Sequence, residues 1–190
     1  MRRRRRRGGF TLIEAALTTV IVGTGVLAIV AAQQAYHIKN NWAQRTGTGL
    51  LLANEIRELT LSLPLHDPIT GDDSIGAEPN EPSIEQYDDL DDFAGNSTNP
   101  IGVDGKQSAA TVFDPPRNAL REVISDMTGW SQEVWVEAVS PDNLGGDGVG
   151  DTYGLDELGT LMRVTVRVLY QKPQADEPME IARLRWVVGD

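Results

Sequence analysis

Two groups of oxygen-bearing side chains could hold a metal ion. Both are rich in aspartate and lie among glycine, proline and other turn-forming residues. Carboxylate and amide oxygens are the ligands that Ca²⁺ prefers, and one ion takes several of them. The sequence therefore allows a structural Ca²⁺ at either group, and it predicts no other cofactor. The first group is Asp88, Asp89, Asp91 and Asp92, and the second is Asp142, Asn143, Asp147 and Asp151.

Each group also has an interpretation without a metal. The first group lies between Tyr87 and Phe93 with Leu90 at its centre, which is typical of a solvated acidic loop pinned by apolar side chains. The second group lies in a Gly-rich stretch between two predicted strands, which is typical of a long flexible hairpin loop. Both interpretations stay open at this point.

No arrangement of residues in the sequence resembles an active site. His37 and His66 are the two histidines, and neither comes with a recognisable nucleophile or set of metal ligands. The chain has no Cys, which excludes disulfides and thiolate chemistry. Its net charge is −11, and there is no basic patch outside Arg2–Arg7, which argues against nucleic-acid binding. We therefore predict that the chain is not an enzyme. A membrane-anchored or secreted binding module or hydrolase is the alternative.

Glu14 is a carboxylate in an unusual position. It is the one charged residue between Phe10 and Ala32, in a stretch that is otherwise apolar or uncharged. At about 1.5 Å per residue this stretch covers roughly 35 Å, enough to cross a bilayer core. A carboxylate at that depth is costly and must find a cation or a proton. Because Arg2–Arg7 precede the span, we predict a single pass with the N-terminus in the cytoplasm.

The order of these features closely resembles the N-terminal signal of type IV pilins and type II secretion pseudopilins. That signal has a short basic leader, a Gly, the sequence Phe-Thr-Leu-Ile-Glu and a hydrophobic helix, and its residues stand here from Gly9 to Glu14. The resemblance implies that a prepilin peptidase cuts between Gly9 and Phe10 and that the same enzyme N-methylates Phe10. It also implies that Glu14 pairs with the N-terminal amino group of a neighbouring subunit during assembly.

The resemblance further implies a place and a set of partners. The chain would be a minor pilin or minor pseudopilin, held first in the bacterial inner membrane and then in a periplasmic pseudopilus or a surface pilus. Its partners would be other pilin or pseudopilin subunits, the prepilin peptidase, membrane lipid, and the inner-membrane assembly platform with its ATPase. Two other interpretations of the N-terminus stay open. One is a secretory signal cleaved after Val30-Ala31-Ala32, and the other is a plain membrane anchor in which Glu14 is incidental.

The remaining sequence predicts an α+β fold, with a long helix packed against a small antiparallel sheet. Apolar residues recur every three or four positions after the span, and no Pro occurs until Pro64. Three later runs, around Val134, Val164 and Leu184, alternate apolar and polar residues as strands do, with Glu on the outer face of the first and Arg on the other two. In the last run, this alternation places Ile181 on the outer face with Arg183 and Arg185. The predicted parts are a leader (1–9), a transmembrane and assembly helix (10–32), its amphipathic continuation (33–63), an acidic loop region rich in Pro and Gly (64–118), and the antiparallel sheet of the globular part (119–190).

Overall fold

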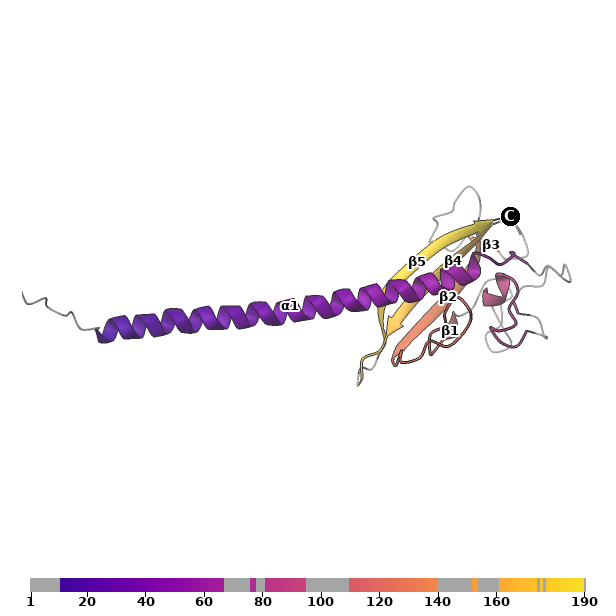
Figure 1. The fold of residues 1–190 in the computed structure, drawn as a ribbon. Helices are drawn as coiled ribbons and strands as arrows, with labels where there is room; N and C mark the ends of the chain where they lie inside the picture. Colours follow the sequence, from indigo (N-terminus) through magenta and orange to yellow (C-terminus); the bar gives the residue numbers. More distant parts are fainter. Residues whose placement is uncertain are drawn as a thin grey trace, which may run out of the picture. The chain divides into compact units, whose positions relative to one another are not determined.

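The computed structural model divides into two compact units. The N-terminal unit is Met1–Gln44 and the head unit is Arg45–Asp190. Helix α1 (Leu12–Thr60) supplies residues to both units (Figure 1). The structure describes residues 11–66, 76–77, 81–94, 110–139, 152–153, 161–173, 175 and 177–189.

The part of α1 in the N-terminal unit is exposed along its whole described length, from Thr11 to Gln44. Three of its hydroxyl groups are satisfied within the helix, because Thr18, Thr19 and Thr24 donate hydrogen bonds to backbone carbonyls one turn earlier. Such internal satisfaction is what a helix needs in order to lie in an apolar medium.

The part of α1 in the head unit has one buried face. Leu52, Ala53, Ile56 and Leu59 are at most 5 % exposed and recur at the spacing of a helix side that faces a core. The helix ends at Thr60, three residues before the predicted end. Because Pro64 disfavours helical dihedrals at the residue before it, the chain from residue 61 onward forms a turn instead.

The head unit contains an antiparallel sheet of five strands. The strands are β1 (Thr111–Phe113), β2 (Trp130–Val139), β3 (Thr152–Tyr153), β4 (Leu161–Tyr170) and β5 (Met179–Gly189). The order across the sheet is β1-β2-β4-β5, and the short β3 pairs with β2 (Figure 1). The predicted α+β fold is confirmed, and β1 and β3 are additions to the three predicted strands.

Valines form the inner face of the sheet. Val134 lies opposite Val166, Val136 lies opposite Val164, and all four are completely buried. They belong to one core cluster with Leu52 and Ile56 of α1. The antiparallel register places β-branched side chains directly opposite one another, which is the pairing that stabilises a sheet best.

Gln132 is the polar residue that joins three parts of the head unit. Its completely buried amide nitrogen donates to the Leu52 carbonyl of α1 at 2.8 Å and to the Arg117 carbonyl at 3.1 Å. Its amide oxygen accepts from the Arg117 backbone nitrogen at 2.7 Å. Because both amide hydrogens and the oxygen are bonded, this buried polar group carries no desolvation penalty for a missing partner.

The outer face of the sheet carries a ladder of ion pairs. Arg163 lies opposite Glu137 and Arg167 lies opposite Glu133, and their charged atoms are 2.8 and 2.9 Å apart. Glu180 of β5 pairs with both Arg167 and Arg183 at 2.8 Å. The predicted arrangement of Glu on β2 against Arg on β4 is confirmed, and each such cross-strand pair contributes about 0.2–1 kcal/mol.

A bulge in the β4–β5 ladder changes the predicted alternation at the start of β5. The register shifts between Val168 and Leu169, and both Ile181 and Ala182 become buried. The prediction that Ile181 faces outward is therefore wrong. Both side chains lie against Gly49 of α1, where an added Cβ would be 2.9 Å from Ile181 Cγ2 and 3.1 Å from Ala182 Cβ.

This close approach predicts that Gly49→Val destabilises the head unit by about 1–3 kcal/mol, because the added side chain overpacks the contact with β5. Gly47→Val is the matched control, since nothing lies within 4 Å of a Cβ at that position in the same helix. Thermal unfolding of the full chain in detergent, followed by tryptophan fluorescence, measures both. Equal loss of stability in the two variants would show that helix propensity alone is responsible.

Candidate functional site

The first candidate site is the N-terminal unit's apolar helix, and it begins with a capping motif. Thr11 precedes the first helical residue, and its hydroxyl oxygen accepts a hydrogen bond from the Glu14 backbone nitrogen at 3.3 Å. Thr11 and Glu14 therefore occupy the cap and third positions of a capping box. This geometry places the Glu14 carboxylate in the first turn, where the helix dipole favours negative charge.

Glu14 is exposed, and its carboxylate has no ion-pair partner among residues 11–66 or elsewhere in the described chain. Large apolar side chains surround it on the same helix, among them Ile13, Leu17 and Ile21, each at least 59 % exposed. By length and composition, α1 could cross a membrane. A carboxylate in such a surface needs a cation or a proton when the surface lies in lipid.

The second candidate site is a buried group of carboxylates in residues 81–94. Apolar side chains hold this segment against the sheet: Tyr87, Leu90 and Phe93 are at most 3 % exposed. The ring of Phe93 meets the rings of Tyr87 and Phe113 edge to face, with centroids 5.2 and 6.3 Å apart. A side-chain hydrogen bond adds to this packing, since the Thr111 hydroxyl of β1 donates to the Phe93 carbonyl at 2.8 Å.

Tyr87, Leu90 and Phe93 are three residues apart. Because all three are buried, the acids between them are buried or half-buried as well. Asp89, Asp91, Asp92 and Glu81 are at most 6 % exposed, and Asp88 is half-buried. The apolar anchoring of this loop is thus confirmed, whereas the interpretation in which its acids are solvated is wrong. Burial of several carboxylates together is costly unless protons or cations compensate.

Hydrogen bonds fix the geometry of the cluster around the short 3-10 helix η1 (Asp91–Ala94). One oxygen of Asp92, Oδ2, accepts from the backbone nitrogens of Asp88 and Asp89 at 2.8 and 3.2 Å. In return, Asp89 Oδ1 accepts from the Asp92 nitrogen at 3.1 Å. Asp91 Oδ2 lies 2.9 Å from His66 Nδ1.

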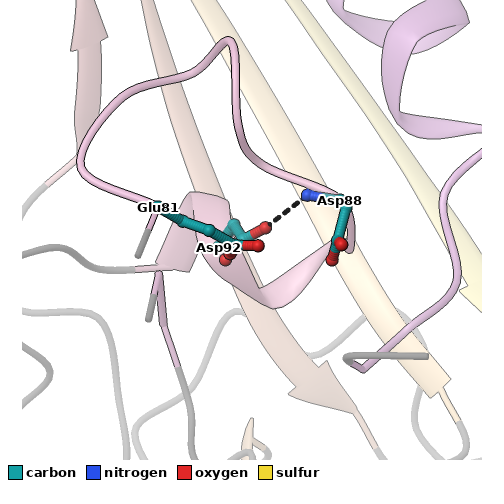
Figure 2. Close-up of side chains that lie close together, drawn as sticks. All are labelled: Glu81, Asp88 and Asp92. Atoms are coloured by element: carbon teal, nitrogen blue, oxygen red, sulfur yellow. Dashed lines mark hydrogen bonds between the residues drawn. The ribbon is translucent and has the colours of Figure 1, made fainter. Parts of the chain in front are cut away.

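Two overlapping sets of carboxylates lie close enough to share one ion. Oxygens of Glu81, Asp88 and Asp92 all lie within 4.8 Å of one another, and so do oxygens of Asp89, Asp91 and Asp92. Figure 2 shows Asp92 between Glu81 and Asp88, with the Asp88 nitrogen bonded to it. Asp92 belongs to both sets and is their common member.

The electrostatics of Asp92 reflect this crowding. Burial, and then the negative charge of Asp89, raise the pKa of the Asp92 carboxyl to about 6, against hydrogen bonds from Asp89, Glu81 and Asp88 that lower it. The other oxygen of Asp92, Oδ1, is buried and has no hydrogen-bond partner, and Asp88 Oδ1 is in the same state. A proton or a cation is what such an oxygen attracts.

The structure brings the first predicted acidic group together, Asp88, Asp89, Asp91 and Asp92. It adds Glu81, which sequence reasoning missed because Glu81 is separated from that group by Pro82–Tyr87 and approaches only when this stretch folds back. It also adds His66, at the end of the turn after α1. The second acidic group, Asp142, Asn143, Asp147 and Asp151, lies outside the described residues, and so do Gly9 and Phe10.

No protein-family model matches the chain, and comparisons with characterised proteins and with solved structures found no match. The layout itself, a long apolar N-terminal helix whose C-terminal part packs on a small antiparallel sheet, is consistent with a pilin-like architecture.

The pKa of Asp92 predicts a pH dependence of stability in protein kept free of divalent cations. The folded value is raised from 3.8 to about 6, so the folded chain holds this proton more tightly than the unfolded chain does. The resulting stabilisation is complete below the pKa that Asp92 has in the unfolded chain. It is lost as the pH rises through the pKa that Asp92 has in the folded chain. The difference corresponds to a free energy on the order of 3 kcal/mol.

Thermal unfolding of the full chain in detergent and EDTA, from about pH 4 to about pH 8, measures this effect through tryptophan fluorescence. Asp92→Asn should flatten the profile, and Glu58→Gln, on an exposed part of α1, should leave it unchanged. The same pH profile in Asp92→Asn and the wild type would rule out Asp92 as its source.

Proposed function

We propose that this chain is a subunit of an envelope filament, a minor pilin or minor pseudopilin, that assembles through the apolar part of α1. The observation that supports this most directly is the described helix of the N-terminal unit. It is apolar over a membrane's thickness, fully exposed, and contains one carboxylate in its first turn. Burying this surface against equivalent helices of other subunits would replace its contacts with lipid.

The proposed sequence of events starts in the bacterial inner membrane. The basic residues Arg2–Arg7 would keep the N-terminus in the cytoplasm, where a prepilin peptidase cuts between Gly9 and Phe10 and methylates Phe10. An assembly platform and its ATPase would then move the subunit from lipid into the periplasmic pseudopilus or the surface pilus.

Glu14 would set the register of assembly. Its carboxylate has no ion-pair partner in the described part of its own chain. The new amino group at Phe10 of a neighbouring subunit is a cation that would lie at about the same depth in the membrane. An unpaired carboxylate inside a bundle of apolar helices costs several kcal/mol, so only a register that pairs it is stable.

The continuity of α1 also bears on the secretory-signal interpretation. Val30, Ala31 and Ala32 lie in the interior of a helix that is assigned without a break from Leu12 to Thr60. Cleavage after Ala32 would cut the same helix whose last residues form the core of the head unit. This observation favours processing before the helix, at Gly9.

We expect Glu14→Gln to be processed normally but to enter filaments at least tenfold less efficiently, since loss of one buried charge pair exceeds 1.4 kcal/mol. The measurement is the amount of the variant in sheared filaments or cross-linked assemblies from cells that contain the assembly machine. Glu58→Gln is the control, because this acid lies on the same helix within the head unit. Normal incorporation of Glu14→Gln would remove the register role.

We expect Gly9→Val to block cleavage, because a peptidase that approaches the backbone closely has no room for a branched side chain. Intact mass and N-terminal sequencing of protein from cells with a prepilin peptidase give the result, with Gly8→Val as the neighbouring control. The wild type should begin at N-methyl-Phe10. A wild-type start at Gln33 would indicate a secretory signal, and an uncut chain would indicate a plain anchor. Either finding contradicts the proposal.

A further inference from the structure

We infer that Glu81, Asp88 and Asp92 form a binding site for one divalent cation of the Ca²⁺ class, which links the two ends of residues 81–94 within the head unit. This site is independent of filament assembly, because all its residues lie within the head unit. It can therefore be present or absent whatever the fate of the apolar helix.

The spacing of the oxygens suits a calcium ion. Ca²⁺ binds oxygens at about 2.3–2.6 Å, so two ligands of the same ion are at most roughly 5 Å apart. The oxygens of Glu81, Asp88 and Asp92 lie within 4.8 Å of one another. Three carboxylates from a loop and a 3-10 helix thus converge without any change of backbone, as Figure 2 shows.

One oxygen of the completely buried Asp92 indicates that a ligand belongs there. Asp92 Oδ2 already accepts two backbone hydrogen bonds, which fix the plane of the carboxylate. Its other oxygen, Oδ1, is buried and accepts none. Buried polar atoms in folded proteins nearly always have a partner, so a buried anionic oxygen among other acids is best explained by a cation.

The charges around Asp92 point the same way. Acids surround its carboxylate, since oxygens of Glu81 and Asp88 lie within 4.8 Å of an Asp92 oxygen and so do oxygens of Asp89 and Asp91. The ion pairs recorded for the head unit's arginines join acids elsewhere, such as Glu85 with Arg117 and Glu137 with Arg163. A divalent ion would neutralise two of the three carboxylates at once.

Access and selectivity follow from the residue types. Asp88 is half-buried although its Oδ1 is buried, so solvent reaches part of this residue and water could complete the coordination. All three ligands are hard oxygens without nitrogen or sulfur, which favours Ca²⁺ or Mg²⁺ over zinc. The neighbouring Asp89 and Asp91 are bonded to the Asp92 nitrogen and to His66, so we assign them to positioning η1.

The test is a calcium titration of the full chain in detergent after removal of metal with EDTA. Isothermal titration calorimetry near neutral pH should give one bound Ca²⁺ per chain, and the thermal midpoint of the head unit should rise with Ca²⁺. Asp88→Asn should weaken binding about tenfold or more, because even outer-shell partners of metal ligands are worth about 10–100-fold. Asp92→Asn should have at least the same effect.

Asp88→Asn keeps the test decisive if Asp92→Asn fails to fold, because the Asp88 side chain is half-buried and its backbone bond to Asp92 is retained. Glu58→Gln serves as the exposed control, and Asp147→Asn reports on the second acidic group. Absence of Ca²⁺ binding to the folded wild type would overturn the inference in favour of a proton shared within the cluster. Binding that survives Asp88→Asn and Asp92→Asn but is lost in Asp147→Asn would overturn it in favour of the other loop.

Discussion

The head unit depends above all on the contact between the last turns of α1 and the inner face of the sheet. Leu52 and Ile56 meet the valines of β2 and β4, and the absence of a side chain at Gly49 lets α1 approach β5. The amide of Gln132 bonds the same stretch of helix at Leu52. Because the chain has no Cys, no disulfide reinforces this packing. Any further link between parts of the head unit must therefore be non-covalent.

The same helix must satisfy two different environments. Before Arg45 its apolar side chains are exposed on every side, whereas after Arg45 one face is buried by the sheet. A helix that is apolar all round needs lipid or other helices, and a helix with one apolar face needs a domain core. The apolar surface and the head-unit core therefore draw on separate residues of α1. In the proposed filament, this separation would let the apolar part exchange lipid for protein while the head unit stays folded.

Much of this fold could be predicted from the sequence because its signals are periodic. The three long strands alternate over ten residues or so, and their Glu and Arg positions pair as the pattern requires. By contrast, β1 and β3 span three and two residues, too few to show a period. Ile181 was misplaced because a bulge at Val168 and Leu169 shifts the alternation, and bulges have no reliable signal in one sequence.

The acidic segment shows where sequence reasoning stops. The composition of residues 81–94 indicates a solvated loop, yet Tyr87, Leu90 and Phe93 draw the intervening acids inside. Burial of each apolar side chain stabilises the folded chain, and burial of each charged acid destabilises it. The net free energy of burying the segment therefore depends on what neutralises the acids. In a chain without disulfides, a cation held by Glu81, Asp88 and Asp92 would turn this unfavourable burial into a cross-link between the segment's ends. The apolar side chains of the segment would then position the acidic ligands, and the bound ion would hold those ligands in place.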